Sequence, residues 1–164
     1  MLLKDALIAE LKHEAVNTRK ILERVPADKF EWQPHAKSMT LGRLASHIAE
    51  IPVWVNRTMD ADSFNFGTFN FSRTTYPDTA ALLKVFDDTL AAAIASLQNA
   101  TDDILNVTYA VYRGEQLMFE LPRKLMIRNF GLNHVIHHRG QLSVFLRLLD
   151  VAVPGMYGPS ADEK

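Results

Sequence analysis

The chain has 164 residues, enough for one domain with a hydrophobic core and too few for two comfortable ones, so we expect a single domain over residues 1–164. Its 18 basic and 19 acidic side chains are spread along the sequence and give a net charge of -1, which argues against nucleic acid as a partner. Because there is no cysteine, disulfides and thiolate ligands are excluded, and any metal ion must be held by His, Asp or Glu.

Two amphipathic helices are predicted in the first part of the chain. Apolar residues recur every three to four positions over residues 2–25, and Pro26 ends that segment. After a turn-rich stretch, Ser38 or Thr40 can cap a second helix. Its apolar side consists of Leu41, Leu44, Ile48, Ile51 and Val55. Pro52 removes a hydrogen bond from the middle of this helix, so we expect a kink.

A long loop and a third helix are predicted next. Residues 61–76 carry four phenylalanines among polar and glycine residues, a pattern that fits neither a helix nor a strand. We expect a loop with aromatic anchors, which would shape an apolar substrate site if it covered the mouth of a pocket. Pro77, at a first-turn position, begins a third helix that ends near Asn99.

The last part of the chain predicts a hairpin and a fourth helix. VTYAVYRGEQLMFELP alternates around Arg113 and Gly114, which indicates a short hairpin or an extended connection. Pro122 begins a helix that runs to about Leu149, and VPGMYGPS forms a turn-rich tail. Four long amphipathic segments with two sizeable connections predict an all-α four-helix bundle, with room for a small β element before the last helix.

Three histidines form a candidate metal site. His134 and His138 lie one helical turn apart in an apolar stripe, so both imidazoles face the core and can bind one divalent ion. His47, at the edge of the apolar side of the second helix, completes a three-histidine set if these helices touch. A buried neutral imidazole needs partners for both ring nitrogens, and a metal ion would supply one. Three protein ligands leave a coordination position open, as in catalytic metal sites.

A structural role is the alternative: buried hydrogen bonds for the pair on the last helix, and an interface position for His47. Val135 follows His134, so the glutamate of an HExxH motif is absent and no general base is expected there. His137 lies about 60° to one side of the stripe and Arg139 points well away, so both are left out of the ligand set.

Other polar residues receive weaker interpretations. Gln141 shares the histidine face and could form a hydrogen bond that fixes the tautomer of a ligand. Asn133 and Glu50 are candidates for such a hydrogen bond or for proton transfer, although ordinary solvated positions suit both. His13 and His35 have charged or polar neighbours and are expected on the surface.

The sequence predicts a cytoplasmic location. The N-terminal stretch MLLKDALIAELKHE is amphipathic and charged, unlike a secretory signal. No apolar run is long enough to span a bilayer, so no membrane partner is expected.

The motifs together resemble a known family. LxxLxxHIAE in the second helix, NHVIHHRGQLSVFLR near the end and the following VPGMYGPSADE are similar to the DinB-like superfamily of damage-inducible four-helix-bundle proteins, over nearly the whole chain. The resemblance implies an up-down-down-up bundle, often a homodimer formed through helix faces. It also implies one divalent metal ion, commonly nickel or zinc, bound by His47, His134 and His138.

The resemblance leaves the reaction open. Some relatives resemble thiol transferases that activate bacillithiol, mycothiol or glutathione, and others look like thiol-dependent isomerases. Our first hypothesis is a metal-dependent enzyme of the S-transferase type, which uses a small thiol as co-substrate for a small-molecule substrate. A metal-dependent hydrolase is the second, and a non-catalytic metal-binding stress-response protein is the third. The missing general base favours the third, and no catalytic residue is assigned.

Overall fold

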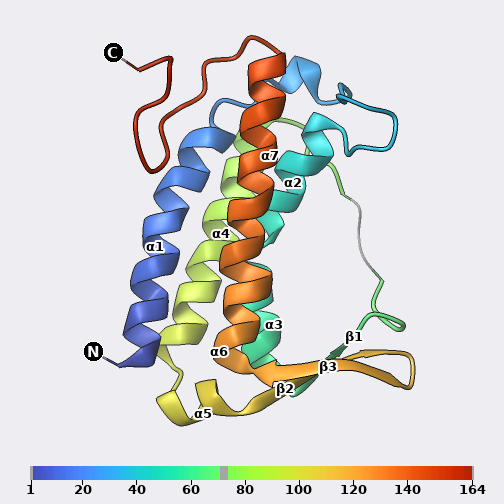
Figure 1. The fold of residues 1–164 in the computed structure, drawn as a ribbon, viewed down its shortest axis with the longest axis vertical. Coiled ribbons are helices and arrows are strands. Elements are labelled where there is room, and N and C mark those ends of the chain that lie inside the picture. Colours follow the sequence, from blue (N-terminus) through green and yellow to red (C-terminus); the bar gives the residue numbers. More distant parts are fainter. Residues whose placement is uncertain (1, 71–73, 164) are drawn as a thin grey trace.

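Four long helical segments lie side by side in the computed structural model, which describes residues 2–70 and 74–163 (Figure 1). They are α1 (Leu3–Leu22), α2 (Leu41–Glu50) with α3 (Val53–Asp60), α4 (Thr79–Gln98) and α7 (His134–Leu148). In the view of Figure 1 the chain runs up α1, down α2 and α3, down α4 and up α7. This arrangement confirms the predicted up-down-down-up bundle.

Shorter elements complete the fold, mostly at the lower end of the bundle in Figure 1. They are a 3₁₀ turn (Ala27–Lys29), β1 (Ser63–Asn65), α5 (Asp102–Asn106), β2 (Thr108–Arg113), β3 (Gln116–Pro122), α6 (Arg123–Met126) and a π-helical segment (Ile127–Asn133). None of the helices described is both long and apolar enough to traverse a bilayer.

Side-chain caps and one proline set where the helices begin and break. Thr40 accepts a hydrogen bond from the Arg43 amide at 3.2 Å, so it is Thr40 that caps α2. Asp78 caps α4 in the same way, and Pro77 therefore precedes the cap instead of lying in the first turn as predicted. The kink expected at Pro52 is a full break between α2 and α3, because proline has no amide hydrogen to continue the ladder.

The predicted hairpin is confirmed, and a third strand pairs with it to form a three-stranded sheet. β2 and β3 are antiparallel and are joined through Gly114, whose φ of 60° suits glycine. β1 pairs with β2 in parallel, so the prediction of a structureless loop over residues 61–76 is wrong for residues 63–65. Asn65 also accepts from the Gly114 amide at 2.9 Å and ties β1 to the hairpin turn. β1 forms through its pairing with β2, which lies 47 residues further along the chain. The residue pattern within β1 itself does not reveal this pairing.

The core consists of three groups of buried apolar side chains. One joins α1, α2, α4 and α7 in the upper part of the bundle, and a second fills the lower part. The third lies between the sheet and the bundle and includes Trp54, Phe64, Tyr109 and Met126. Phe64 therefore acts as the aromatic anchor that the sequence predicted for this segment, whereas Phe71 lies outside the described residues.

A buried ion pair holds α7 against α1. The Arg139 guanidinium donates to the Glu14 carboxylate and to the Tyr157 hydroxyl, each at 2.6 Å, and also to the Thr18 hydroxyl at 3.1 Å. The side chains of Arg139 and Glu14 are 3% and 8% exposed. The sequence placed Arg139 away from the histidines, and the structure supplies the reason: it faces α1 and the C-terminal tail.

Replacing Glu14 by Gln should lower the free energy of unfolding by about 3 kcal/mol, because the buried Arg139 charge loses its compensating carboxylate. Urea unfolding measures the effect. Glu10→Gln, on the same helix, is the matched control: the Glu10 pair with Arg128 is partly solvated and should contribute less than about 1 kcal/mol. Equal losses in the two variants would contradict a special role for the buried pair.

Candidate metal centre

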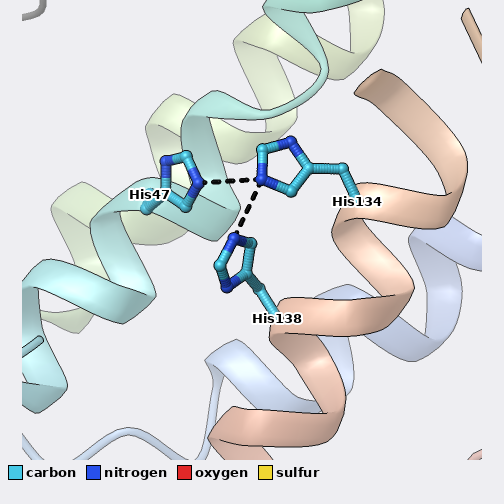
Figure 2. Close-up of side chains that lie close together, drawn as sticks. All are labelled: His47, His134 and His138. Carbon is cyan, nitrogen blue, oxygen red and sulfur yellow. Dashed lines mark hydrogen bonds between the residues drawn. The ribbon is translucent and has the colours of Figure 1, made fainter. Parts of the chain in front are cut away.

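His47, His134 and His138 point toward one another between α2 and α7 (Figure 2). The Nε2 atoms of His47 and His134 lie 3.2 Å apart, and those of His134 and His138 lie 2.9 Å apart. One ring nitrogen from each of the three residues falls within 4.8 Å of the others. The structure thus brings together the three histidines singled out from the sequence.

Regular helix geometry positions the two histidines of α7. Their four-residue separation places both on one face, because 3.6 residues complete a turn. The π-helical segment Ile127–Asn133 ends directly before His134, and such wide turns often occur near functional sites. On the facing helix, His47 lies on the second turn of α2, at a partly buried position.

Two carbonyl oxygens orient the imidazoles of α7. The side-chain oxygen of Gln141 lies 2.7 Å from Nδ1 of His138, and the backbone oxygen of Phe130 lies 3.3 Å from Nδ1 of His134. These oxygens can only accept, so each Nδ1 carries the proton of the neutral ring and each Nε2 presents a lone pair. The hydrogen bond predicted for Gln141 is therefore present. Two lone pairs that face each other at 2.9 Å repel unless a cation lies beside them.

Protonation of the histidines does not provide this positive charge near neutral pH. Burial, together with the neighbouring imidazoles, lowers the pKa of His47 to about 3 and that of His134 to about 4. Burial also lowers the pKa of His138. The cluster is uncharged at pH 7, with its lone pairs free for another positive centre.

The nitrogen spacing suits a divalent metal ion. Two nitrogens that bind a tetrahedral zinc ion at about 2.0–2.1 Å are about 3.3 Å apart. The observed separations of 3.2 and 2.9 Å are near this value. The residues present therefore fit a metal site of three imidazoles.

A cavity of about 880 Å³ opens beside the cluster, and both His47 and His134 line it. One wall is a stripe of five side chains of α2 and α3 spaced by four, three, four and three residues: Arg43, His47, Glu50, Trp54 and Arg57. The sequence analysis singled out His47 and, as a weaker candidate, Glu50 in this stripe, but not Arg43, Trp54 or Arg57. The helical spacing was a usable signal, but the break at Pro52 hid the continuity of the face.

Aromatic side chains form the opposite part of the cavity wall. Phe66 and Phe69, from the segment predicted as an aromatic loop, line the cavity together with Phe130. Trp54 and Phe130 lie in ring contact with centroids 5.2 Å apart. The phenylalanine-rich segment thus contributes to a cavity wall, the condition under which the sequence analysis gave it a role in shaping an apolar site beside its role as a packing anchor.

Glu50 lines the cavity but is engaged elsewhere. It accepts from the Arg43 guanidinium at 3.1 Å and from the Tyr76 hydroxyl at 3.2 Å. Burial raises the pKa of Tyr76, and the Glu50 carboxylate raises it further. Glu50 is thus held by its neighbours on the cavity wall, and no hydrogen bond to His47 is present among the described residues.

The other candidates lie outside the cluster. Asn133, His13 and His35 are exposed, as expected for the two histidines. His137 is exposed as well, and its ring contacts that of His138 with centroids 4.8 Å apart. Excluding His137 from the ligand set agrees with this position.

The fold and the cluster define a helical bundle that is compatible with binding a divalent metal through three histidines. The chain belongs to the DinB family, whose sequence model matches residues 1–164. It is similar to the uncharacterized protein YrdA of Bacillus subtilis strain 168, with 27% identity over 163 residues that span 97% of this chain and 90% of that protein.

Two solved structures have the same fold. A DinB-like protein from Bacillus cereus ATCC 10987 matches with a TM-score of 0.71 and 24% identity, covering 93% of this chain and 97% of that one. The DinB-like protein YjoA from Bacillus subtilis matches with a TM-score of 0.68 and 16% identity, covering 97% and 99%. At these identities the likeness shows the fold.

Chelator-treated protein should lose stability as the pH falls from 7 to 4. The folded-state pKa values of His47 and His134, about 3 and 4, lie below the unfolded value of about 6.5. Below about pH 6.5 the unfolded chain therefore binds more protons, and acid favours unfolding. Urea unfolding at several pH values should give a shallower loss for His47→Gln, His134→Gln than for wild type. Equal slopes would contradict burial of neutral imidazoles.

Proposed function

We propose that His47, His134 and His138 bind one divalent metal ion, with nickel or zinc as the first candidates. The observation that carries the proposal is the convergence of their Nε2 atoms, two of them 2.9 Å apart, while carbonyl oxygens occupy the Nδ1 side of His134 and His138. Imidazole suits both of these metals. The family resemblance assigns the same three residues.

We further propose that the site is catalytic and serves a thiol-dependent transferase. A divalent ion in such a site lowers the pKa of a thiol or water that occupies its open position. The three histidines hold the ion, and Gln141 and the Phe130 carbonyl fix two of the rings. Phe66, Phe69 and Phe130 give the cavity beside the histidines an aromatic wall against which the apolar part of a substrate can pack.

The thiol must come from outside the chain, which has no cysteine. In the proposed transfer its S–H proton goes to solvent, and the sulfur forms a bond to an electrophilic carbon of a small-molecule substrate. The leaving group departs with the electrons of the broken bond. Glu50 is bound to Arg43 and Tyr76 rather than to the histidines, so this carboxylate is not placed to activate water, which favours a thiol over the hydrolytic alternative.

Three further expectations stay predictions. They are the single domain over residues 1–164, the homodimer through helix faces and the cytoplasmic location.

Elemental analysis should find about one divalent ion per chain in the wild-type protein and none in His134→Ala, His138→Ala, because one remaining imidazole cannot retain the ion. His13→Ala, His35→Ala removes two exposed histidines instead and should keep the metal content of wild type. Absence of metal from the reconstituted wild type, or its retention by the first variant, would overturn the assignment.

Turnover of a panel of electrophiles should require both the metal and an added small thiol, and His47→Ala should abolish it while the fold is kept. Product formation followed by mass spectrometry measures the sulfur adduct directly. Metal-dependent turnover without any thiol would favour the hydrolase, and metal binding without turnover would favour the non-catalytic stress-response protein.

A further inference from the structure

Arg57 occupies the far end of the helix face that carries His47. Arg57 follows His47 by ten positions, and the break at Pro52 lies between them. Both line the same cavity, and Trp54 lies between them. Phe130 lies in ring contact with Trp54, and its carbonyl faces Nδ1 of His134. Two aromatic side chains of the cavity wall thus link the histidine cluster with Arg57.

The Arg57 guanidinium is surrounded by aromatic rings. Its central carbon lies 4.3 Å from the ring centroid of Phe69, 4.9 Å from that of Trp54 and 5.9 Å from that of Phe64. Within residues 2–70 and 74–163, no carboxylate forms an ion pair with it. Burial lowers the pKa of Arg57 more than the Glu50 carboxylate, which forms no ion pair with it, raises it.

The other two cationic side chains of the cavity, Arg43 and Lys37, have an ion pair or are exposed to solvent. Arg43 pairs with Glu50 at 3.1 Å and donates to the backbone oxygen of Thr74 at 2.6 Å. Lys37 is exposed, where water satisfies its charge. Among the described residues, Arg57 is therefore the cavity cation that is partly desolvated and has no direct ion pair, and a bound anion would reduce that cost.

We propose that Arg57 binds the carboxylate of a small molecule whose reactive end lies at the three histidines and whose apolar part contacts Trp54 and Phe130. This inference rests on the proposed function for the role of the reactive end. A planar guanidinium pairs with a carboxylate through two parallel hydrogen bonds, while its face remains on the aromatic rings. A single cation without a direct ion pair suits a singly charged carboxylate better than a doubly charged phosphate. The cavity volume of about 880 Å³ accommodates a small molecule of this size.

Isothermal titration calorimetry with paired acids and amides tests the proposal. One pair is 3-phenylpropionate and 3-phenylpropanamide, and the other is N-acetylcysteine and its amide. Wild type should bind the acid of at least one pair about tenfold more tightly than the amide, the effect of one charge-assisted hydrogen-bonded contact. Tighter binding of 3-phenylpropionate than of its amide would indicate that the electrophilic substrate carries the carboxylate. Tighter binding of N-acetylcysteine than of its amide would indicate that the thiol carries it.

Variants separate Arg57 from the metal site. Arg57→Gln should reduce the preference below about twofold, Arg57→Lys should retain part of it through its charge, and Lys37→Gln should keep it. His134→Ala, His138→Ala should also keep it, which distinguishes this site from carboxylate binding by a metal ion. Circular dichroism confirms the fold of each variant. Equal binding of acid and amide by wild type, or an unchanged preference in Arg57→Gln, would overturn the proposal even if the protein binds metal.

Discussion

The contact of three neutral imidazoles between α2 and α7 is the constraint on which the functional part of this structure depends. The Nε2 atom of His134 lies 2.9 Å from that of His138 and 3.2 Å from that of His47. The rings are uncharged at neutral pH, because burial lowers the pKa values of His47 and His134 to about 3 and 4. Uncharged imidazoles that face one another in a buried seam cost free energy unless a cation satisfies them. The same burial that removes protons leaves the lone pairs available for a metal ion.

The rest of the bundle keeps this contact in place. Apolar side chains of α1, α2, α4 and α7 form one continuous core around the upper part of the site. The buried pair of Arg139 and Glu14 fixes α7 on the side away from the histidines, so that α7 is held by a charge contact on one face and presents its imidazoles on another. The Phe130 carbonyl and Gln141 then orient the rings.

The sequence predicted the parts of the fold that depend on local spacing. Apolar periodicity located the four helical segments, alternation located the hairpin, and the four-residue separation of His134 and His138 placed both on one face. The resemblance to the DinB-like superfamily then supplied the way in which the helices meet.

Features that depend on contacts between distant residues were missed. β1 exists through its pairing with β2, and Glu14 becomes the partner of Arg139 only when α1 and α7 meet, 125 residues apart in sequence. The role of Arg57 was hidden because Pro52 interrupts the helix between it and His47, although both still line one cavity. In each case the contacting residue lies too far away in the sequence, or beyond a helix break, for the periodicity of a single helix or strand to reveal it.

The location of the metal tests the account most directly. A crystal of the reconstituted protein, measured on either side of the absorption edge of the added metal, reveals the ion by anomalous scattering. The account predicts one peak bound by the Nε2 atoms of His47, His134 and His138, at about 2.0–2.1 Å for zinc. A peak that lacks any of these three nitrogens as a ligand, or a fully loaded protein with its metal elsewhere, would contradict it.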